Sequence, residues 1–219
     1  IPMCTVPLQA PELAVAELER CHKEYGMRGV EIGTNVGGKE LTRIGLEKFF
    51  AKVEELDMLI FMHPIGTTEG DRMKDHYFTN LIGHPLESAL AVGYLVFDGY
   101  LERHPNLKVL FSECRIGWVP FALEWCDRQV AERAPDPSAP LSLLPSEYAK
   151  RNCGFTFEED YVGTEMMKLD WCNLGDVAIW GSDYPHPQGT WPDVSIPIDK
   201  MFEGVPADVK QRVLWDHAA

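Results

Sequence analysis

The sequence predicts an α/β protein built on a parallel sheet, and three observations support this fold class. Short apolar strands alternate with helices five times along the chain. No glycine-rich phosphate-binding motif follows any of these strands, which disfavours a nucleotide-binding doubly wound sheet. Polar side chains follow three of the strands directly, at the ends where (β/α) barrels build their active sites. The predicted architecture is therefore a (β/α)8 TIM barrel.

The first half of the chain supplies two of the predicted strands. Apolar residues recur at helical spacing over residues 11–25, and a short strand is predicted over residues 28–34. Residues 42–56 form an amphipathic helix. The continuous apolar run at residues 58–63 is typical of a parallel strand covered on both faces. A long polar loop over residues 65–82 follows it.

The second half supplies three more strands and closes the fold. In order, we predict a long helix over 85–103, a strand over 107–113, a helix over 119–132, a proline-rich surface excursion over 135–145, a strand over 149–157, a helix over 162–172, a strand over 177–183, and helices near 195–203 and 206–218. No linker interrupts this series. We therefore expect a single domain over residues 1–219.

The composition excludes several classes of protein. The chain has 219 residues, of which 45% are hydrophobic, so it can bury a sizeable core. Its net charge of −14 disfavours nucleic acid and anionic membranes as partners, because both attract basic surfaces. No apolar run is long enough to cross a membrane. The six cysteines are scattered without a CxxC motif, which predicts free thiols and a cytoplasmic location.

Three polar residues stand at the ends of predicted strands: His63, Glu113 and Asp183. Each has an ordinary structural explanation. His63 could donate to a backbone carbonyl, Glu113 could pair with Arg115, and Asp183 could cap a turn. Three such placements on one sheet nevertheless favour a shared site, since the carboxyl ends of barrel strands meet at one mouth. Imidazole nitrogen and carboxylate oxygen together suit a divalent ion such as Zn²⁺ or Mn²⁺.

The other histidines carry weaker signals. His76 lies in the long loop after the strand that ends at His63, from which it could reach the mouth. His84 begins a helix and His186 lies in the loop behind Asp183, so both are predicted to contact substrate. His104 precedes a proline at a helix end and is predicted to be a surface residue.

Four motifs, in this order and spacing, resemble one enzyme superfamily. They are Phe61-Met62-His63-Pro64, His104-Pro105-Asn106-Leu107-Lys108, Gly181-Ser182-Asp183-Tyr184-Pro185 and Asp216-His217-Ala218-Ala219. Together they are similar to the amidohydrolase-related superfamily (amidohydrolase family 2), and within it to the branch named for aminocarboxymuconate-semialdehyde decarboxylase. The resemblance extends over residues of about 25–219.

This resemblance implies a metal site and a partial barrel. His63 matches the family's ligand on strand five and Asp183 its ligand on strand eight, so together they imply one divalent metal ion, with Zn²⁺ favoured over Mn²⁺. Glu113 stands where much of the family has a histidine that assists proton transfer, so it is either an acid/base catalyst or a ligand. Counted back from strand eight, the chain would hold strands four to eight, with strands one to three and the remaining ligands encoded upstream.

The resemblance also implies a reaction. The branch favours non-oxidative decarboxylation of a small carboxylic acid, with Glu113 moving the proton and Arg115 gripping a carboxylate. Hydrolysis of an ester, amide or lactone is the alternative, because the same strand-end residues would serve a hydrolase. An inactive or binding homologue on the same scaffold is a third possibility. Members of the branch are often dimers, so a homodimer is expected.

Overall fold

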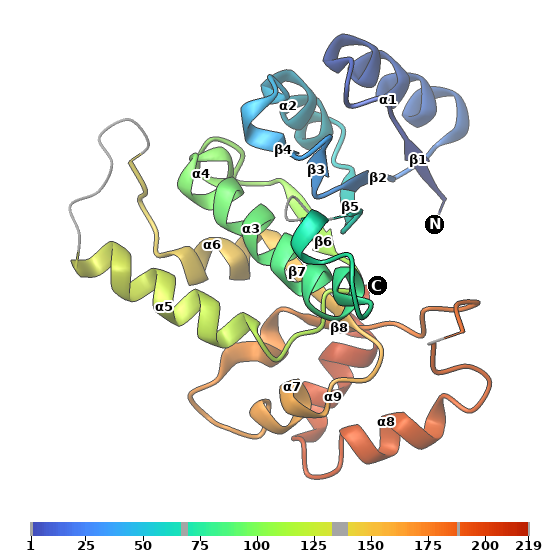
Figure 1. Ribbon diagram of the computed structural model, residues 1–219, viewed down its shortest axis with the longest axis vertical. Helices are drawn as coiled ribbons and strands as arrows, with labels where there is room; N and C mark the ends of the chain where they lie inside the picture. The colour runs from blue at the N-terminus through green and yellow to red at the C-terminus, as the bar shows by residue number, and fades with distance from the viewer. Residues whose placement is uncertain (1, 67–69, 133–139, 188, 219) are drawn as a thin grey trace.

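The computed structural model describes residues 2–66, 70–132, 140–187 and 189–218 (Figure 1). Its centre is a parallel sheet with the strand order β1-β2-β5-β6-β7-β8. These strands are β1 (Met3–Thr5), β2 (Gly29–Gly33), β5 (Leu59–His63), β6 (Lys108–Phe111), β7 (Cys153–Phe157) and β8 (Ala178–Trp180). A short antiparallel ribbon, β3 (Asn35–Val36) with β4 (Lys39–Glu40), follows β2. An α/β fold of this kind is consistent with a partial TIM barrel.

Among the described residues the sheet has six strands, so the predicted number of five is wrong. The missed strand is β1, which pairs in parallel with β2 so that Met3 lies opposite Gly29 and Thr5 opposite Glu31. Three residues followed closely by Pro7 are too short to show a strand periodicity. Hydrogen bonds to its neighbour define this strand, and a single sequence does not reveal them.

Nine α-helices occur among the described residues. They are α1 (Pro11–Tyr25), α2 (Glu47–Glu55), α3 (His84–Phe97), α4 (Tyr100–Arg103), α5 (Val119–Glu132), α6 (Pro145–Asn152), α7 (Tyr161–Met166), α8 (Ser195–Met201) and α9 (Ala207–Leu214). The bounds of α1 and α5 agree with the prediction. Within the described part of the chain, no helix has the length and apolar character needed to cross a membrane.

Several predicted boundaries are wrong for identifiable reasons. The long helix over 85–103 breaks into α3 and α4 because Gly99 adopts a left-handed conformation with φ of 72°. The strand over 149–157 is half helix: α6 occupies its first part, starting from Pro145 in the first helical turn. The helix over 42–56 begins only at Glu47, after a 3₁₀ turn, and that over 162–172 ends at Met166. Residues 133–139 of the proline-rich excursion lie outside the described residues.

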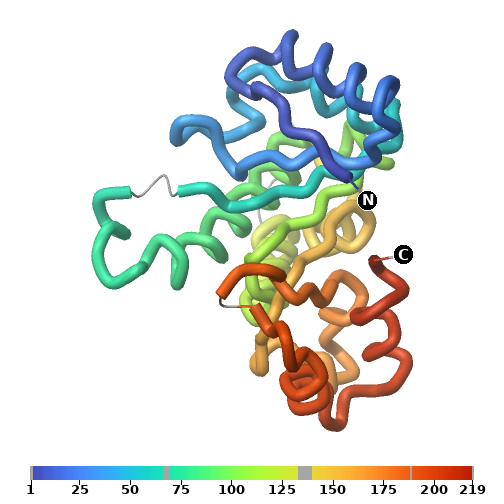
Figure 2. The backbone as a smooth tube through the Cα atoms, turned by 90° about the vertical axis from the view of Figure 1, so that its right-hand side faces the viewer, coloured from blue at the N-terminus to red at the C-terminus, as the bar shows by residue number. Residues whose placement is uncertain are grey.

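The two faces of the sheet differ in burial. Val30, Ile60, Val109, Phe155 and Ala178 point toward the helices and are buried in the core. The alternate positions on the other face are exposed at Glu31 and only partly covered at Phe61, Leu110, Thr156 and Ile179. In a barrel this second face points inward. The loop after β5 extends beyond the C-terminal edge of the sheet (Figure 2).

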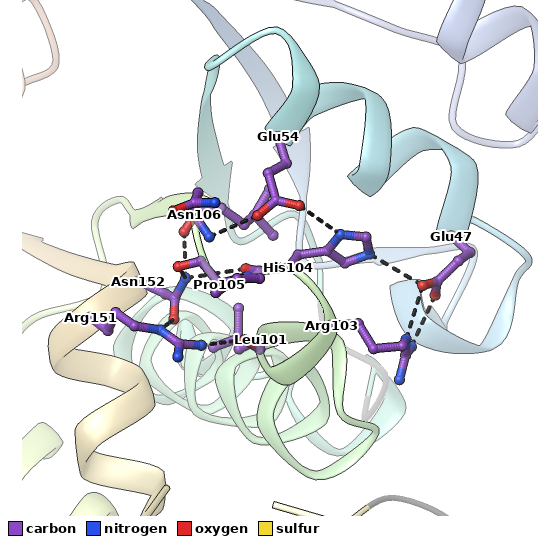
Figure 3. A network of polar contacts seen from close by, with 10 residues as sticks. Glu47, Glu54, Leu101, Arg103, His104, Pro105, Asn106, Arg151 and Asn152 are labelled. Carbon is purple, nitrogen blue, oxygen red and sulfur yellow. Dashed lines mark hydrogen bonds and ion pairs between the residues drawn. The ribbon is translucent and has the colours of Figure 1, made fainter. Parts of the chain in front are cut away.

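His104 is buried, so its predicted place on the surface is wrong. Its ring lies between two carboxylates of α2: Nδ1 is 3.0 Å from Glu54 Oε2, and Nε2 is 3.2 Å from Glu47 Oε1 (Figure 3). The backbone N–H of Asn106 donates to Glu54, and the side-chain amide of Asn152 donates to the Leu107 carbonyl at 2.7 Å. These bonds anchor the chain where it enters β6, and so they position the strand whose far end leads to the candidate site.

All six cysteines are free thiols, as predicted. Five of them are buried, and Cys126 is partly exposed. Burial raises the pKa of the Cys153 thiol to about 12 and that of Cys4 to about 11. These side chains therefore act as small apolar core residues.

Candidate active site

The register of the sheet brings the predicted site residues to one edge. His63, the last residue of β5, pairs with Gly33, the last of β2, and Met62 pairs with Phe111 at the end of β6. Glu113 follows β6 by two residues, and Asp183 follows β8 by three. Because all the strands run in the same direction, these residues share the C-terminal edge of the sheet.

His63 and Glu113 are in direct contact. The His63 Nε2 atom lies 2.9 Å from Glu113 Oε1, and Nδ1 lies 2.9 Å from the carbonyl oxygen of Pro64. A carbonyl only accepts, so Nδ1 carries a proton and donates it. The hydrogen bond with Glu113 raises the pKa of His63, and the same bond lowers the pKa of the Glu113 carboxyl. The predicted carbonyl partner of His63 is thus present, and Glu113 pairs with His63 rather than with Arg115.

The backbone at the ends of β6 and β8 is unusual. Glu113 and Asp183 have φ of 48° and 55°, in the left-handed region that residues other than glycine rarely adopt. The Glu113 N–H donates to Thr156 Oγ1 of β7 at 3.0 Å, which holds this conformation in place. Such strained residues cluster at active sites and ligand-binding segments. The strain therefore supports a functional role for these two carboxylates.

Asp183 lies beside Glu113. Burial raises the pKa of Asp183, and the neighbouring charge of Glu113 and a hydrogen-bond contact with it raise it further. The His186 Nδ1 atom is 3.2 Å from Asp183 Oδ2. The backbone carbonyl of Asp183 also accepts from the His186 N–H at 2.7 Å, so the predicted turn is present as well. The His84 ring stands 5.9 Å from that of His63, edge to face, and burial lowers its pKa.

His76, a predicted substrate contact, lies apart from the other predicted site residues. His76 is exposed, and its ring packs 5.4 Å from that of Phe78. Within the described ranges, no contact joins His76 to His63, Glu113 or Asp183. Its role in binding substrate stays a prediction.

Arg115 lies next to β7. Its guanidinium donates to the backbone carbonyl of Glu159 and stands 3.7 Å from the Glu158 carboxylate. It adopts φ of 57°, a third left-handed residue in this part of the chain. Half of its side chain is exposed, so it can still meet a ligand.

Glu158 and Asp160 were missed by the sequence reading. Glu158 directly follows β7, so the strand-end position that indicates a role for His63 indicates one for Glu158 as well. Asp160 caps α7 by accepting from the Gly163 N–H. Its second carboxylate oxygen accepts from the N–H groups of Ile116 and Gly117, in the loop after β6. Asp160 therefore ties the loops after β6 and β7 together.

The donor types at this edge fit a divalent cation. Nδ1 of His63 donates to the Pro64 carbonyl, so Nε2 is the ring atom available to bind a metal. Glu113 Oε1 lies 2.9 Å from this Nε2 atom. Asp183 adds a further carboxylate. Among residues 2–66, 70–132, 140–187 and 189–218, however, no three His, Cys, Asp or Glu side chains already stand together as a metal-binding group. The chemistry of the donors fits an ion: His63 contacts Glu113 directly, and Asp183 lies beside Glu113.

Comparisons with known proteins point to one family. A family model described as amidohydrolase matches residues 1–219. The 2-amino-3-carboxymuconate-6-semialdehyde decarboxylase of Dictyostelium discoideum is 33% identical over 187 residues, which cover 84% of this chain and 51% of that protein. The gamma-resorcylate decarboxylase of a Polaromonas species is 26% identical over 190 residues, covering 82% of this chain and 58% of that protein. This chain thus spans little more than half the length of these relatives.

Solved structures share the fold. The 5-carboxyvanillate decarboxylase of Sphingomonas paucimobilis superposes with a TM-score of 0.83 at 21% identity, over 99% of this chain and 64% of that one. A dihydroxybenzoic acid decarboxylase from Polaromonas, with bound manganese and the inhibitor 2-nitroresorcinol, gives 0.80 at 19% identity, over 99% and 67%. At these identities the similarity establishes the fold alone. It supports the predicted α/β fold, as part of a TIM barrel of the amidohydrolase type.

Proposed function

Because this chain belongs to the amidohydrolase family, we propose that it forms part of a metal-dependent enzyme that removes CO₂ from a small carboxylic acid without oxidation. Relatives that match most of this chain are named decarboxylases. The contact of 2.9 Å between His63 Nε2 and Glu113 Oε1 carries the proposal, since it joins a metal-ligand type of side chain to an acid/base group at the mouth.

We propose that His63 and Asp183 hold one divalent ion, Zn²⁺ or Mn²⁺. Such an ion acts as a Lewis acid that stabilises negative charge. The Pro64 carbonyl fixes the tautomer and direction of the His63 ring, as outer hydrogen bonds do for metal-binding histidines. His186 in turn lies 3.2 Å from the Asp183 carboxylate, in the same loop after β8.

We assign the proton to Glu113. When CO₂ leaves, the carbon that loses it must accept a proton, and the donor must lie at the mouth of the barrel. Glu113 is half-buried there, hydrogen-bonded to His63, and held by the Thr156 hydroxyl through its backbone. The proton can be held by either partner of the His63–Glu113 contact, and Glu113 lies where it can pass that proton on at a short distance.

We propose that Arg115, His84 and His186 bind the substrate. The half-exposed Arg115 guanidinium provides the positive charge that a carboxylic acid requires. His84, held neutral by its lowered pKa, can donate or accept a hydrogen bond beside His63. Structural relatives contain 2,6-dihydroxybenzoate and 2-nitroresorcinol, so a small aromatic acid is the favoured class. A cytoplasmic location and a homodimer are part of the same proposal.

The test is product analysis with metal-loaded protein. We expect CO₂ release from hydroxybenzoic or muconate-type acids and, in D₂O, one deuterium at the carbon that lost it. His63→Ala should lower metal content and activity at least 100-fold, whereas the control His22→Ala, on α1, should change neither. Hydrolysis of activated esters without CO₂ release would replace the proposal with the hydrolase alternative. Absence of both reactions, together with absence of metal, would indicate an inactive or binding homologue.

A further inference from the structure

Glu158 occupies a central place at the mouth and has no role in the proposed reaction. It directly follows β7, which lies between β6 and β8 in the sheet, so it stands between the strands that carry Glu113 and Asp183. Alternation along β7 puts it on the same face as Thr156, whose hydroxyl holds Glu113. Glu158 is also the most deeply buried of the three carboxylates, with 11% of its side chain exposed against 19% for Asp183 and 31% for Glu113.

A carboxylate buried among other carboxylates needs a cation. Burial raises the pKa of Glu158, the charges of Asp183 and Glu113 raise it further, and Arg115 opposes this shift. The Arg115 Nη1 atom lies 3.7 Å from Glu158 Oε2. Arg115 is therefore the group that offsets the cost of placing Glu158 there.

The same contact orients Arg115. Its Nη1 donates to the Glu159 carbonyl and faces Glu158, while 49% of the side chain is exposed. In the part of the chain that the structure describes, its Nε and Nη2 atoms have no hydrogen-bond partner. The guanidinium is thus held along one edge and leaves another edge open, the arrangement that binds a carboxylate through two parallel hydrogen bonds.

The chemistry of decarboxylation decides which anion this edge should bind. A cation that holds the departing carboxylate stabilises the ground state, and that stabilisation is lost as CO₂ becomes neutral. A cation that holds an anionic group elsewhere on the substrate keeps its interaction through the reaction. Arg115 is therefore better suited to a second, non-reacting anionic group.

We propose that Glu158 is a positioning residue for Arg115, and that the pair selects acids with a second anionic group, such as a second carboxylate, besides the one that is lost. This inference rests on the proposed function for its reaction, although its binding component can be tested separately. Glu158 acts through Arg115 and does not touch the reacting atoms.

The variants follow from the geometry. Glu158→Gln keeps the shape of the side chain and removes its charge, and Arg115→Ala removes the guanidinium. Glu159→Gln is the matched control, because Glu159 is adjacent and exposed and offers Arg115 only its backbone carbonyl. We expect Glu158→Gln to fold, since a neutral amide is cheaper to bury than a carboxylate; circular dichroism and thermal melting check this.

The first measurement is binding of isophthalate and benzoate to the metal-loaded protein by calorimetry. Glu158→Gln should weaken isophthalate binding about tenfold and leave benzoate within twofold. In the Arg115→Ala background, Glu158→Gln should have no further effect. Glu159→Gln should match wild type. Equal losses for both ligands, or an undiminished effect of Glu158→Gln in the Arg115→Ala background, would overturn the inference.

The second measurement separates the two proposals. With a diacid that releases CO₂, Glu158→Gln should raise KM about tenfold while kcat stays within twofold. If CO₂ is released and KM does not change, the role of Glu158 is wrong and the decarboxylase proposal stands. If no acid releases CO₂, the decarboxylase proposal fails, and the isophthalate titration still decides whether Glu158 positions Arg115. Should Glu158→Gln fail to fold, Arg115→Lys, which keeps the charge but loses the planar fork, must show the same loss for isophthalate over benzoate.

Discussion

Removing the Asp160 carboxylate should loosen the loops that carry the acidic residues of the mouth. Its two oxygens accept three backbone N–H groups: Ile116 at 2.7 Å, Gly117 at 2.9 Å and Gly163 at 2.8 Å. Two of these donors belong to the loop after β6, and the third, Gly163, lies in the first turn of α7. Asp160→Ala leaves all three without their acceptor.

The expected cost follows from these bonds. A hydrogen bond to a charged group contributes about 1.5–3 kcal/mol, and bonds that share one carboxylate do not add fully. We therefore expect Asp160→Ala to lower the free energy of unfolding by about 3–6 kcal/mol. Asp160→Asn keeps one acceptor oxygen and turns an NH₂ group toward the remaining donors, so it should lose about half as much. Because a domain is stable by only about 5–15 kcal/mol, the alanine variant should lie near the limit of folding.

Urea unfolding followed by circular dichroism measures this cost. Losses of this size should lower the midpoint by more than about 1 M for Asp160→Ala, with Asp160→Asn between it and wild type. The control is Asp170→Ala, which removes an exposed aspartate that has no side-chain partner in the described parts of the chain. A midpoint for Asp160→Ala equal to that of Asp170→Ala would show that the carboxylate does not hold these loops.

Three further predictions concern other parts of the chain. In metal-free protein, the ion pair of His63 and Glu113 should stabilise the fold most between pH 4.5 and 6.5. This stabilisation is lost as the pH rises through the raised pKa of His63, and also as it falls through the lowered pKa of Glu113. Glu113→Gln should abolish this pH dependence of the free energy of unfolding, measured by urea titration. Gly163→Ala should cost about 1–3 kcal/mol, because its β-carbon would press on a buried isoleucine, whereas Gly93→Ala, in open space on α3, should stabilise by about 0.5–1 kcal/mol in the same assay. Alkylation of native protein should modify Cys126 before the five buried thiols, as peptide mass spectrometry would show.

The sequence predicts the fold class well where strands are long and apolar. The runs ending at His63, Phe111 and Trp180 form β5, β6 and β8, because parallel strands covered on both faces need continuous apolar residues. The prediction fails where contacts with neighbouring elements determine the secondary structure. Three residues become β1 only by pairing with β2, and α6 was read as strand because its eight residues show too little helical periodicity before β7 begins.

The candidate site was predictable in part for a related reason. The prediction that residues at the ends of parallel strands converge needs only the strand ends, so the contact of His63 with Glu113 across 50 positions could be anticipated. The contact of Arg115 with Glu158 could not be predicted from the sequence. Sequence proximity suggested Glu113, whereas left-handed backbone at both residues turns their side chains to different neighbours. Such conformations depend on the surrounding loops and leave no mark in the residue types.

The opposed pKa shifts at the mouth show how its charges are balanced. The pKa of Glu113 is lowered because its hydrogen bond to His63 favours the ionised form, whereas those of Asp183 and Glu158 are raised because burial adds to repulsion from neighbouring carboxylates. Arg115 compensates Glu158 only in part. Three carboxylates thus share one edge of the sheet, and the basic side chains beside them are His63, Arg115 and His186. A divalent ion in place of the His63 proton would add one net positive charge, which would lower the pKa of Asp183. The clustering of carboxylates whose pKa values are raised is therefore a physical reason for a cation at this edge, independent of the family to which the chain belongs.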